Sequence, residues 1–177
     1  AIQASFFVTS RTLEDTTPLW HDSVSSLMEH LSSAIRRGFG AASSTVGERA
    51  AALLAELAEK PYAGLGARSV GIESALENTK RWQPAQRNDW IQRASALLPR
   101  ITREPWDGFM TVGQLKELLQ DGHEIGSHSH THPLLPQCTD EELVGEIEGS
   151  KRRLESALGV AITTFCYPNG STDHRSV

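Results

Sequence analysis

The order of the elements predicted from residue 109 onward constrains the fold more than any other feature of the sequence. The apolar pattern predicts a helix at 111–122, a strand at 123–127, a second helix at 139–159 and a second strand at 160–167. Each helix opens with a threonine that is followed three residues later by Gln or Glu, a pairing that caps helix N-termini. Helices and strands that alternate with such short connections are typical of a parallel α/β sheet.

A polar motif stands at the end of each of these predicted strands. The segment 128–132 (HSHTH) follows the first strand, and the segment 167–170 (YPNG) ends the second. Functional groups of parallel α/β folds collect at the carboxyl ends of the strands. We therefore expect both motifs at the functional edge of the sheet.

The first part of the chain has a different pattern. Residues 2–9 (IQASFFVT) are apolar and favour a buried strand, whereas residues 10–108 are mostly helical in pattern. Helix starts are predicted at 17–18 and 83–84, where proline would occupy the first helical position. We find no catalytic motif in this block. Its tryptophans fit helical cores better than sugar-stacking positions: Trp20, Trp82, Trp90 and Trp106.

The composition excludes several classes of function. The 177 residues carry a formal net charge of −5, and 38% of them are hydrophobic, enough to bury an ordinary core. No basic block provides the footprint of a nucleic-acid or membrane-surface protein. No stretch approaches the ~20 apolar residues of a transmembrane helix. The two cysteines, Cys138 and Cys166, do not make a disulfide framework. Compartment and oligomeric state stay open.

Histidines cluster in the segment HEIGSHSHTHP, and two metal-binding arrangements are compatible with their spacing. In a turn, His128 and His132 would lie on one face with Cβ atoms ~6 Å apart, against ~13 Å on an extended strand. Alternatively, a strand-borne His-x-His pair would join His130 to either of them. Each pair supplies two imidazoles, and a catalytic zinc ion takes three protein ligands. We interpret His123 and Glu124, at the start of the strand, as structural.

Five segments together resemble the polysaccharide deacetylase family, also called NodB-homology or chitin deacetylase-like. They are SFFV (5–8), GQLKELLQDG (113–122), HEIGSHSHTHPLL (123–135), EIEGSKRRLE (146–155) and FCYPNG (165–170). The resemblance implies an α/β fold, a partial distorted (β/α) barrel with fewer strands than a full TIM barrel. Residues 1–177 would then be one deacetylase domain, incomplete at both ends, and residues 10–108 a mostly helical insertion within it.

The family's second motif, His-Ser/Thr-x-x-His, matches the histidine segment. The resemblance implies that His128 and His132 bind a divalent metal, with zinc the expected ion, and that His130 occupies a variable place. The family's first motif supplies the catalytic aspartate base and the third metal ligand. We expect it before Ala1, and the general-acid histidine after Val177.

The family's third motif, Arg-x-Pro-Tyr/Phe-Gly, corresponds to residues 166–170 with two departures. Cys166 takes the place of the arginine, which orients the catalytic aspartate, and Asn169 takes the place of the aromatic residue. A backbone N–H that binds the oxyanion does not depend on the side chain it belongs to. The resemblance therefore implies an oxyanion role for the Asn169 N–H and substrate contacts for Tyr167 and Pro168.

The implied activity is metal-dependent removal of acetyl groups from an N-acetylated or O-acetylated poly- or oligosaccharide. Two alternatives stay open: a metal-free hydrolase of cyclic amides or ureides on the same scaffold, and a catalytically incomplete carbohydrate-binding fragment. A third, an amidohydrolase-like enzyme with a strand-borne His-x-His pair, would carry that pair on its first strand and lack the YPNG turn.

Overall fold

The computed structural model describes residues 2–36, 44–58, 71–98 and 108–177. The chain divides into two compact units, which we describe separately. Unit 1 comprises residues 1–17 together with 103–177, and unit 2 comprises residues 18–102. Each unit has its own cluster of buried apolar side chains. No helix in the described ranges is long and apolar enough to span a bilayer.

Unit 1 is built around two parallel strands, β1 (Ser5–Val8) and β2 (Glu124–Ser127). The register pairs the first residue of one strand with the first residue of the other. Because side chains alternate across a strand, Phe6 points into the core of unit 1 while Phe7 lies on the other face and is 41% exposed. The parallel pairing agrees with the α/β pattern predicted from the sequence.

Gly126 in β2 allows close packing on the outer face of this sheet. A Cβ atom at this position would lie 2.6 Å from two ring carbons of Phe7 and 2.6 Å from the Thr164 hydroxyl oxygen. Real Cβ atoms do not approach other atoms this closely, so a glycine is needed here for Phe7 and Thr164 to pack against β2.

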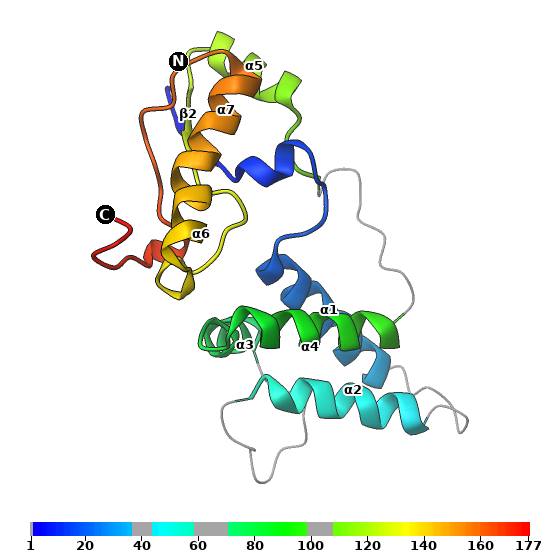
Figure 1. The fold of residues 1–177 in the computed structure, drawn as a ribbon. Coiled ribbons are helices and arrows are strands. Elements are labelled where there is room, and N and C mark those ends of the chain that lie inside the picture. The colour runs from blue at the N-terminus through cyan, green and yellow to red at the C-terminus, as the bar shows by residue number, and fades with distance from the viewer. Residues whose placement is uncertain (1, 37–43, 59–70, 99–107) are drawn as a thin grey trace. The chain divides into compact units, whose positions relative to one another are not determined.

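The helices of unit 1 are α5 (Val112–Gln120), α6 (Asp140–Val144) and α7 (Ser150–Leu158). Figure 1 shows α6 and α7 as one continuous helical column. A π-helical turn, η5 (Gly145–Gly149), joins them. Short 3₁₀ turns complete the unit: η1 (Ser10–Leu13), η4 (Leu135–Gln137) and η6 (Pro168–Gly170).

Local capping signals place these helices where the sequence predicts them. The Thr111 hydroxyl accepts the Gln114 N–H, and the Thr139 hydroxyl accepts the Glu142 N–H, each completed as a capping box. Gly159 ends α7 in the left-handed conformation with φ 75°. The core of unit 1 is formed by Leu115, Ile125, Leu154, Leu158 and Ile162.

The strand predicted at 160–167 does not form, so this part of the prediction is wrong. The segment pairs with β2 at a single parallel bridge between Phe165 and Ser127. The Ser127 N–H donates to the Thr164 carbonyl and the Cys166 N–H donates to the Ser127 carbonyl, each at 2.9 Å. The chain therefore runs beside β2 without a continuous ladder.

Side chains of α7 form hydrogen bonds with the N–H and carbonyl of Ile162, which a longer strand would need for its pairing with β2. The Ile162 N–H donates to Glu155 Oε1 at 3.0 Å, and the Ile162 carbonyl accepts a hydrogen bond from Lys151 Nζ. A residue whose N–H and carbonyl both bind side chains cannot join a sheet ladder. This competition explains why the predicted strand is reduced to one bridge.

Unit 2 consists of the helices α1 (Trp20–Arg36), α2 (Ser44–Glu56), α3 (Ile72–Lys80) and α4 (Pro84–Leu97). Trp90 on α4 is completely buried, and its Nε1 donates to the Leu53 carbonyl at 3.0 Å. Trp20 and Trp82 pack against the same core, as expected, while Trp106 lies outside the described residues.

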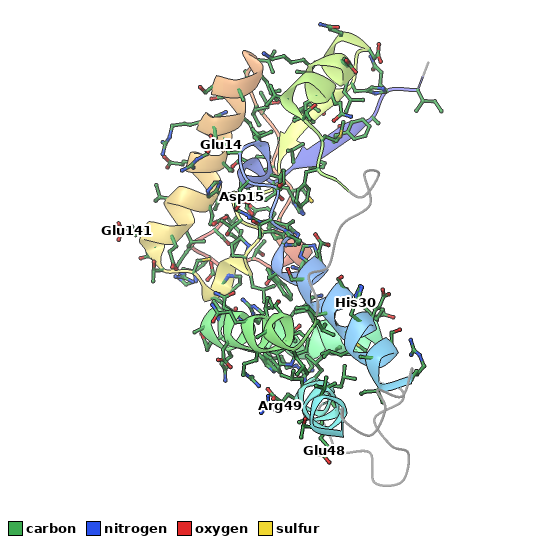
Figure 2. All side chains as sticks on the ribbon, turned by 90° about the vertical axis from the view of Figure 1, so that its right-hand side faces the viewer. Glu14, Asp15, His30, Glu48, Arg49 and Glu141 are labelled. Atoms are coloured by element: carbon green, nitrogen blue, oxygen red, sulfur yellow. The ribbon has the colours of Figure 1, made fainter. Side chains whose placement is uncertain are left out.

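Helix α4 begins at Pro84 as predicted, but α1 begins at Trp20, two residues later than expected. The backbone of Thr17 is held by residues that precede it. Its N–H donates to Asp15 Oδ1 at 2.8 Å, and its carbonyl accepts from Arg11 Nη2 at 2.9 Å. Figure 2 shows Asp15 near the end of η1. Because the Thr17 carbonyl already accepts this hydrogen bond, it does not serve as the first carbonyl acceptor of α1.

Candidate metal centre

The candidate site begins where β2 ends and the chain turns. The His128 N–H donates to the Val8 carbonyl at 2.9 Å, which extends the strand pairing by one residue. Ser129 and His132 then adopt φ values of 65° and 61°, in the left-handed region that non-glycine residues rarely enter. The Ser129 hydroxyl accepts the His132 N–H at 3.0 Å. Residues 128–132 therefore form a turn rather than an extended strand.

This turn brings the rings of His128 and His132 together. Their centroids are 4.8 Å apart and their planes are inclined by 71°. His132 is buried, with 9% of its surface exposed, and His128 is half-buried. Of the two arrangements left open by the sequence, this geometry corresponds to the turn.

A backbone carbonyl determines the tautomer of His128. Its Nδ1 lies 2.7 Å from the Cys166 carbonyl oxygen, which can only accept a hydrogen bond. Nδ1 therefore carries the proton, and in the neutral ring the lone pair lies on Nε2. Metal-binding histidines typically donate their second ring N–H in this way, which orients the ring and raises its basicity.

His130 is engaged elsewhere. Its Nδ1 lies 2.9 Å from the Ser10 hydroxyl oxygen. Burial, reinforced by the positive charge of Arg153, lowers the pKa of the His130 imidazole. The structure thus joins the middle histidine of the motif to η1, while its two neighbours share a ring contact.

The described parts of the chain bring two imidazoles together, whereas a catalytic zinc site takes three protein ligands. Among these residues, no group of three or more His, Cys, Asp or Glu side chains is arranged to hold a metal ion. The chemistry of the two imidazoles fits zinc, which binds neutral histidine nitrogen.

The second predicted motif forms a tight turn, η6. The Gly170 N–H donates to the Tyr167 carbonyl at 2.9 Å, and Asn169 adopts φ 56°. Asn169 is exposed, Tyr167 is half-buried, and Pro168 is less than 2% exposed. The Tyr167 ring packs edge-on against Phe165, with centroids 5.1 Å apart. The roles of these residues in substrate binding stay predictions.

The two motifs are connected through the backbone. The Cys166 carbonyl that binds His128 immediately precedes Tyr167 and the η6 turn. No hydrogen bond between described residues uses the Asn169 N–H. This N–H is therefore a donor that an incoming group could engage.

Sequence reasoning missed two residues that contact the histidine turn or the end of the strand before it. Both Glu146 in η5 and Ser150 at the start of α7 are buried and polar. Glu146 accepts hydrogen bonds from the backbone of His130 and Thr131. The Ser150 hydroxyl lies 2.6 Å from the Ser127 hydroxyl. Their spacing from Leu143, three and seven residues on the same helical face, is the signal that could have identified them.

The residues at the start of β2 have structural contacts, in keeping with their interpretation from the sequence. His123 Nδ1 accepts the Ala4 N–H at 3.2 Å. Glu124 accepts hydrogen bonds from the hydroxyls of Ser5 and Thr164. These contacts connect the beginning of β2 to its neighbours on both sides.

Asp173 closes a turn near the end of the chain. Its Oδ1 accepts the Arg175 and Ser176 N–H groups, and its Oδ2 lies 2.7 Å from Arg175 Nη2. The hydrogen bond from Arg175 lowers the pKa of Asp173. The same guanidinium also binds the Cys138 carbonyl and Asp140 at the start of α6. Arg175 therefore fastens this turn to the loop before α6.

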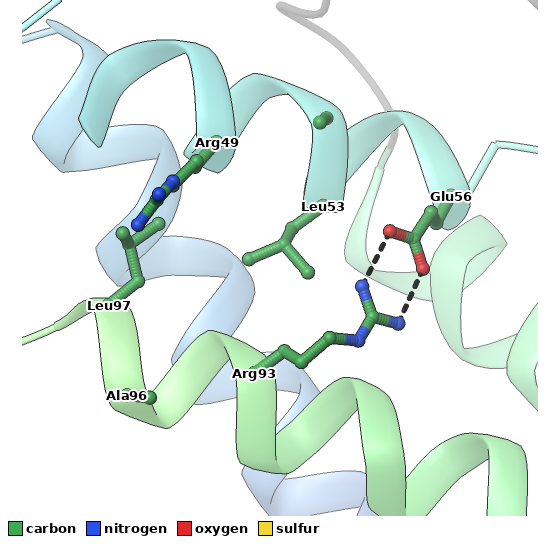
Figure 3. Close-up of a pocket in the computed structure, with 7 residues that line it drawn as sticks. Arg49, Leu53, Glu56, Arg93, Ala96 and Leu97 are labelled. Carbon is green, nitrogen blue, oxygen red and sulfur yellow. Dashed lines mark hydrogen bonds and ion pairs between the residues drawn. The ribbon is translucent and has the colours of Figure 1, made fainter. Parts of the chain in front are cut away.

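Unit 2 contains a pocket between α2 and α4, with Leu53 and Leu97 among its apolar lining residues. Figure 3 shows Glu56 paired with Arg93 at its edge by two hydrogen bonds, both of 2.8 Å. This pairing, together with Asp89, raises the pKa of Arg93 above its ordinary value. The charged groups at this edge neutralise one another, and we assign them a structural role.

The fold and the site define the class of unit 1: a parallel α/β protein with paired histidines after a strand. Comparison with known proteins then shows which family residues 109–177 resemble. Residues 109–177 match the polysaccharide deacetylase family model. Chitin deacetylase 1 from Cryptococcus neoformans is 38% identical over 63 residues, which is 33% of this chain and 13% of that protein. Residues 109–177 are therefore polysaccharide deacetylase-like.

Two further proteins are similar to parts of the chain. Uncharacterized protein YlxY from Bacillus subtilis is 34% identical over 56 residues, covering 32% of this chain and 18% of that protein. A crystal structure of a polysaccharide deacetylase from Bacillus cereus aligns with a TM-score of 0.37 at 25% identity, over 51% of this chain and 32% of that one. The chain thus spans less than a third of the length of each of the two curated relatives.

Proposed function

We propose that this protein is a metal-dependent hydrolase that removes acetyl groups from an N-acetylated or O-acetylated poly- or oligosaccharide. One observation carries the proposal: the rings of His128 and His132 meet at 4.8 Å, in a segment that matches the polysaccharide deacetylase family. The hydrogen bond from His128 Nδ1 to the Cys166 carbonyl adds support, because it leaves Nε2 as the ligand atom.

The same proposal extends to the fold. We propose that unit 1 belongs to a distorted (β/α) barrel and that residues 10–108 are a helical insertion in it. The parallel pairing of β1 with β2, and the parallel bridge from Ser127 to Phe165 on the other side, support this arrangement. The separate core formed by α1 to α4 supports the insertion.

We propose zinc as the divalent ion, held by His128 and His132 together with a further ligand. When bound, zinc supplies a Lewis acid that polarises the acetyl carbonyl and lowers the pKa of a bound water. The Cys166 carbonyl keeps the proton of His128 on Nδ1. The Asn169 N–H donates to the oxygen on which negative charge develops during attack on the acetyl carbon. We assign the catalytic base and the general acid to none of the described residues.

Zinc binding tests the ligand pair. His128→Ala and His132→Ala should each weaken zinc binding by more than the ~10–100-fold that is typical of losing a supporting residue. His130→Ala is the matched control and should retain zinc within a few fold, because its ring binds Ser10. Zinc affinity is measured by competition with a chromophoric chelator. Loss of zinc from His130→Ala, with binding kept by the other two variants, would contradict the assignment.

Substitutions at Asn169 test the oxyanion role. In the full-length protein, Asn169→Gly keeps the N–H and suits the positive φ of 56°, so we expect deacetylation of acetylated chito-oligomers to be retained. Asn169→Ala also keeps the N–H but is strained at this φ, and we expect a modest loss. A loss of about 100-fold or more in both variants would instead indicate a role for the side chain.

The same assays separate the alternative functions. A wild-type chain that hydrolyses a cyclic ureide without zinc would support the metal-free hydrolase. Binding of acetylated chito-oligomers by the full-length protein, with hydrolysis of none of these substrates, would support the carbohydrate-binding interpretation.

A further inference from the structure

We infer that Glu146 is a positioning residue for the candidate metal centre: its buried carboxylate holds the backbone of the histidine turn and so fixes the approach of His128 to His132. The expected effect of Glu146 on metal binding rests on the proposed function, in which His128 and His132 bind zinc. The structural part of the inference, that Glu146 holds the turn by hydrogen bonds, rests only on contacts within unit 1.

The carboxylate of Glu146 binds three donors of the turn. Oε2 accepts the N–H groups of His130 and Thr131, both at 2.8 Å, and Oε1 accepts the Thr131 hydroxyl at 2.7 Å. Glu146 is 9% exposed. Hydrogen bonds to an ionised carboxylate are about twice as strong as those between neutral groups. One side chain therefore fixes two consecutive peptide groups between the candidate ligands.

The turn needs such support because of its backbone conformation. Ser129 and His132, on either side of the two bound peptide groups, both have positive φ. Non-glycine residues persist in this region when the surrounding structure holds them there. Without the carboxylate, the backbone of His130 and Thr131 would lose its buried acceptor, and the turn would relax toward the ordinary extended conformation.

Glu146 lies in the π-helical turn η5, and Ser150 follows it at the start of α7. Ser150, four residues after Glu146, donates to the Ile147 carbonyl and lies 2.6 Å from the Ser127 hydroxyl. The helical column therefore contacts the segment at two points: before His128 through Ser150, and inside the turn through Glu146. π-helical turns of this kind are frequent at functional sites.

A conservative substitution separates positioning from direct metal binding. In Glu146→Gln, the amide oxygen can still accept both backbone N–H groups, and its NH₂ can donate to the Thr131 hydroxyl. A positioning role therefore predicts that Glu146→Gln retains most of the zinc affinity. A ligand role predicts that Gln and Ala lose zinc alike, because a neutral amide does not replace a ligating carboxylate.

The experiment uses the 177-residue chain and two readouts. Zinc affinity is measured by chelator competition, and amide hydrogen exchange at His130 and Thr131 is measured by NMR without metal. We expect Glu146→Ala to weaken zinc binding about 10–100-fold and to raise exchange at both amides at least about tenfold. Glu146→Gln should stay within about fivefold of wild type in both.

Glu148→Ala is the matched control, because Glu148 lies in the same turn and pairs at the surface with Arg152 at 3.0 Å. It should change neither readout. Unchanged exchange at His130 and Thr131 in Glu146→Ala, or equal zinc loss in Gln and Ala, would overturn the inference. A wild-type chain without zinc affinity would contradict the proposed metal site, and the metal-free exchange rates would still decide the role of Glu146.

A second variant applies if Glu146→Ala does not fold. Thr131→Val removes the hydroxyl donor and keeps the backbone N–H of residue 131. We therefore expect this variant to fold. We expect amide hydrogen exchange at residues 130 and 131 to rise about fivefold, because one of the three hydrogen bonds to the Glu146 carboxylate is lost. Unchanged exchange in this variant would overturn the inference.

Discussion

Asp15 is a surface side chain whose charge is stabilised by its immediate neighbours. The hydrogen bond from the Thr17 hydroxyl is the largest cause, followed by the Thr17 N–H and Arg11, and together they lower the pKa of Asp15 to about 2. The unfolded value is about 3.9, so the folded pKa is the lower of the two. The contribution of Asp15 to stability is therefore complete above about pH 4 and is lost as the pH falls through about 2.

Thr17→Val should raise the pKa of Asp15 toward its ordinary value, because it removes the largest of these hydrogen bonds. The pKa should stay below the ordinary value, since the backbone N–H of residue 17 and Arg11 still bind the carboxylate. An NMR titration of the Asp15 carboxyl carbon measures the change. Thr16→Val is the matched control and should leave the titration unchanged. An equal rise in both variants would contradict the role of Thr17.

The candidate site shows what a residue pattern can and cannot predict. The four-residue spacing of His128 and His132 predicts a shared face, and the structure places their rings in contact. The tautomer of His128 depends on the Cys166 carbonyl, 38 residues further along the chain, and no pattern within the motif contains it. The hydrogen bonds of Glu146 to the turn were missed for the same reason, because they join residues 15 and 16 positions apart.

At the scale of whole elements, the same distinction between local and distant causes applies. Helices α4, α5 and α6 begin where predicted, because their caps lie within three residues of each start. The strand expected at 160–167 fails, because Lys151 and Glu155 on α7 bind the Ile162 backbone. Apolar spacing along 139–159 fits a regular helix, so it gives no warning of the π-helical turn.

Two glycines of unit 1 should respond in opposite directions to the same substitution. Gly126→Ala should lower the free energy of unfolding by about 1–3 kcal/mol, because its Cβ would collide with Phe7 and Thr164. Gly145→Ala should raise it by up to about 1 kcal/mol, because Gly145 has helical φ and ψ and open space around it. Urea unfolding measures both. Equal effects at the two positions would contradict the packing described for β2.

At the scale of the whole molecule, each unit has its own buried core, and the two cores can be tested one at a time. Trp90 is completely buried in unit 2, and Leu154 is completely buried in unit 1. We expect Trp90→Ala to cost about 3–5 kcal/mol and Leu154→Ala about 2–5 kcal/mol. Hydrogen exchange measured by mass spectrometry shows in which helices each variant loses protection. Equal loss of protection in both units from one substitution would contradict the separation of the cores.

The contact between His128 and Cys166 has a practical consequence. The group that orients the imidazole is a peptide carbonyl, so the Cys166 side chain takes no part in it. Cys166 carries a free, half-buried thiol. A spectroscopic reporter attached to this sulfur would therefore label the residue that orients the His128 ring, while the carbonyl that binds the ring is left chemically unchanged.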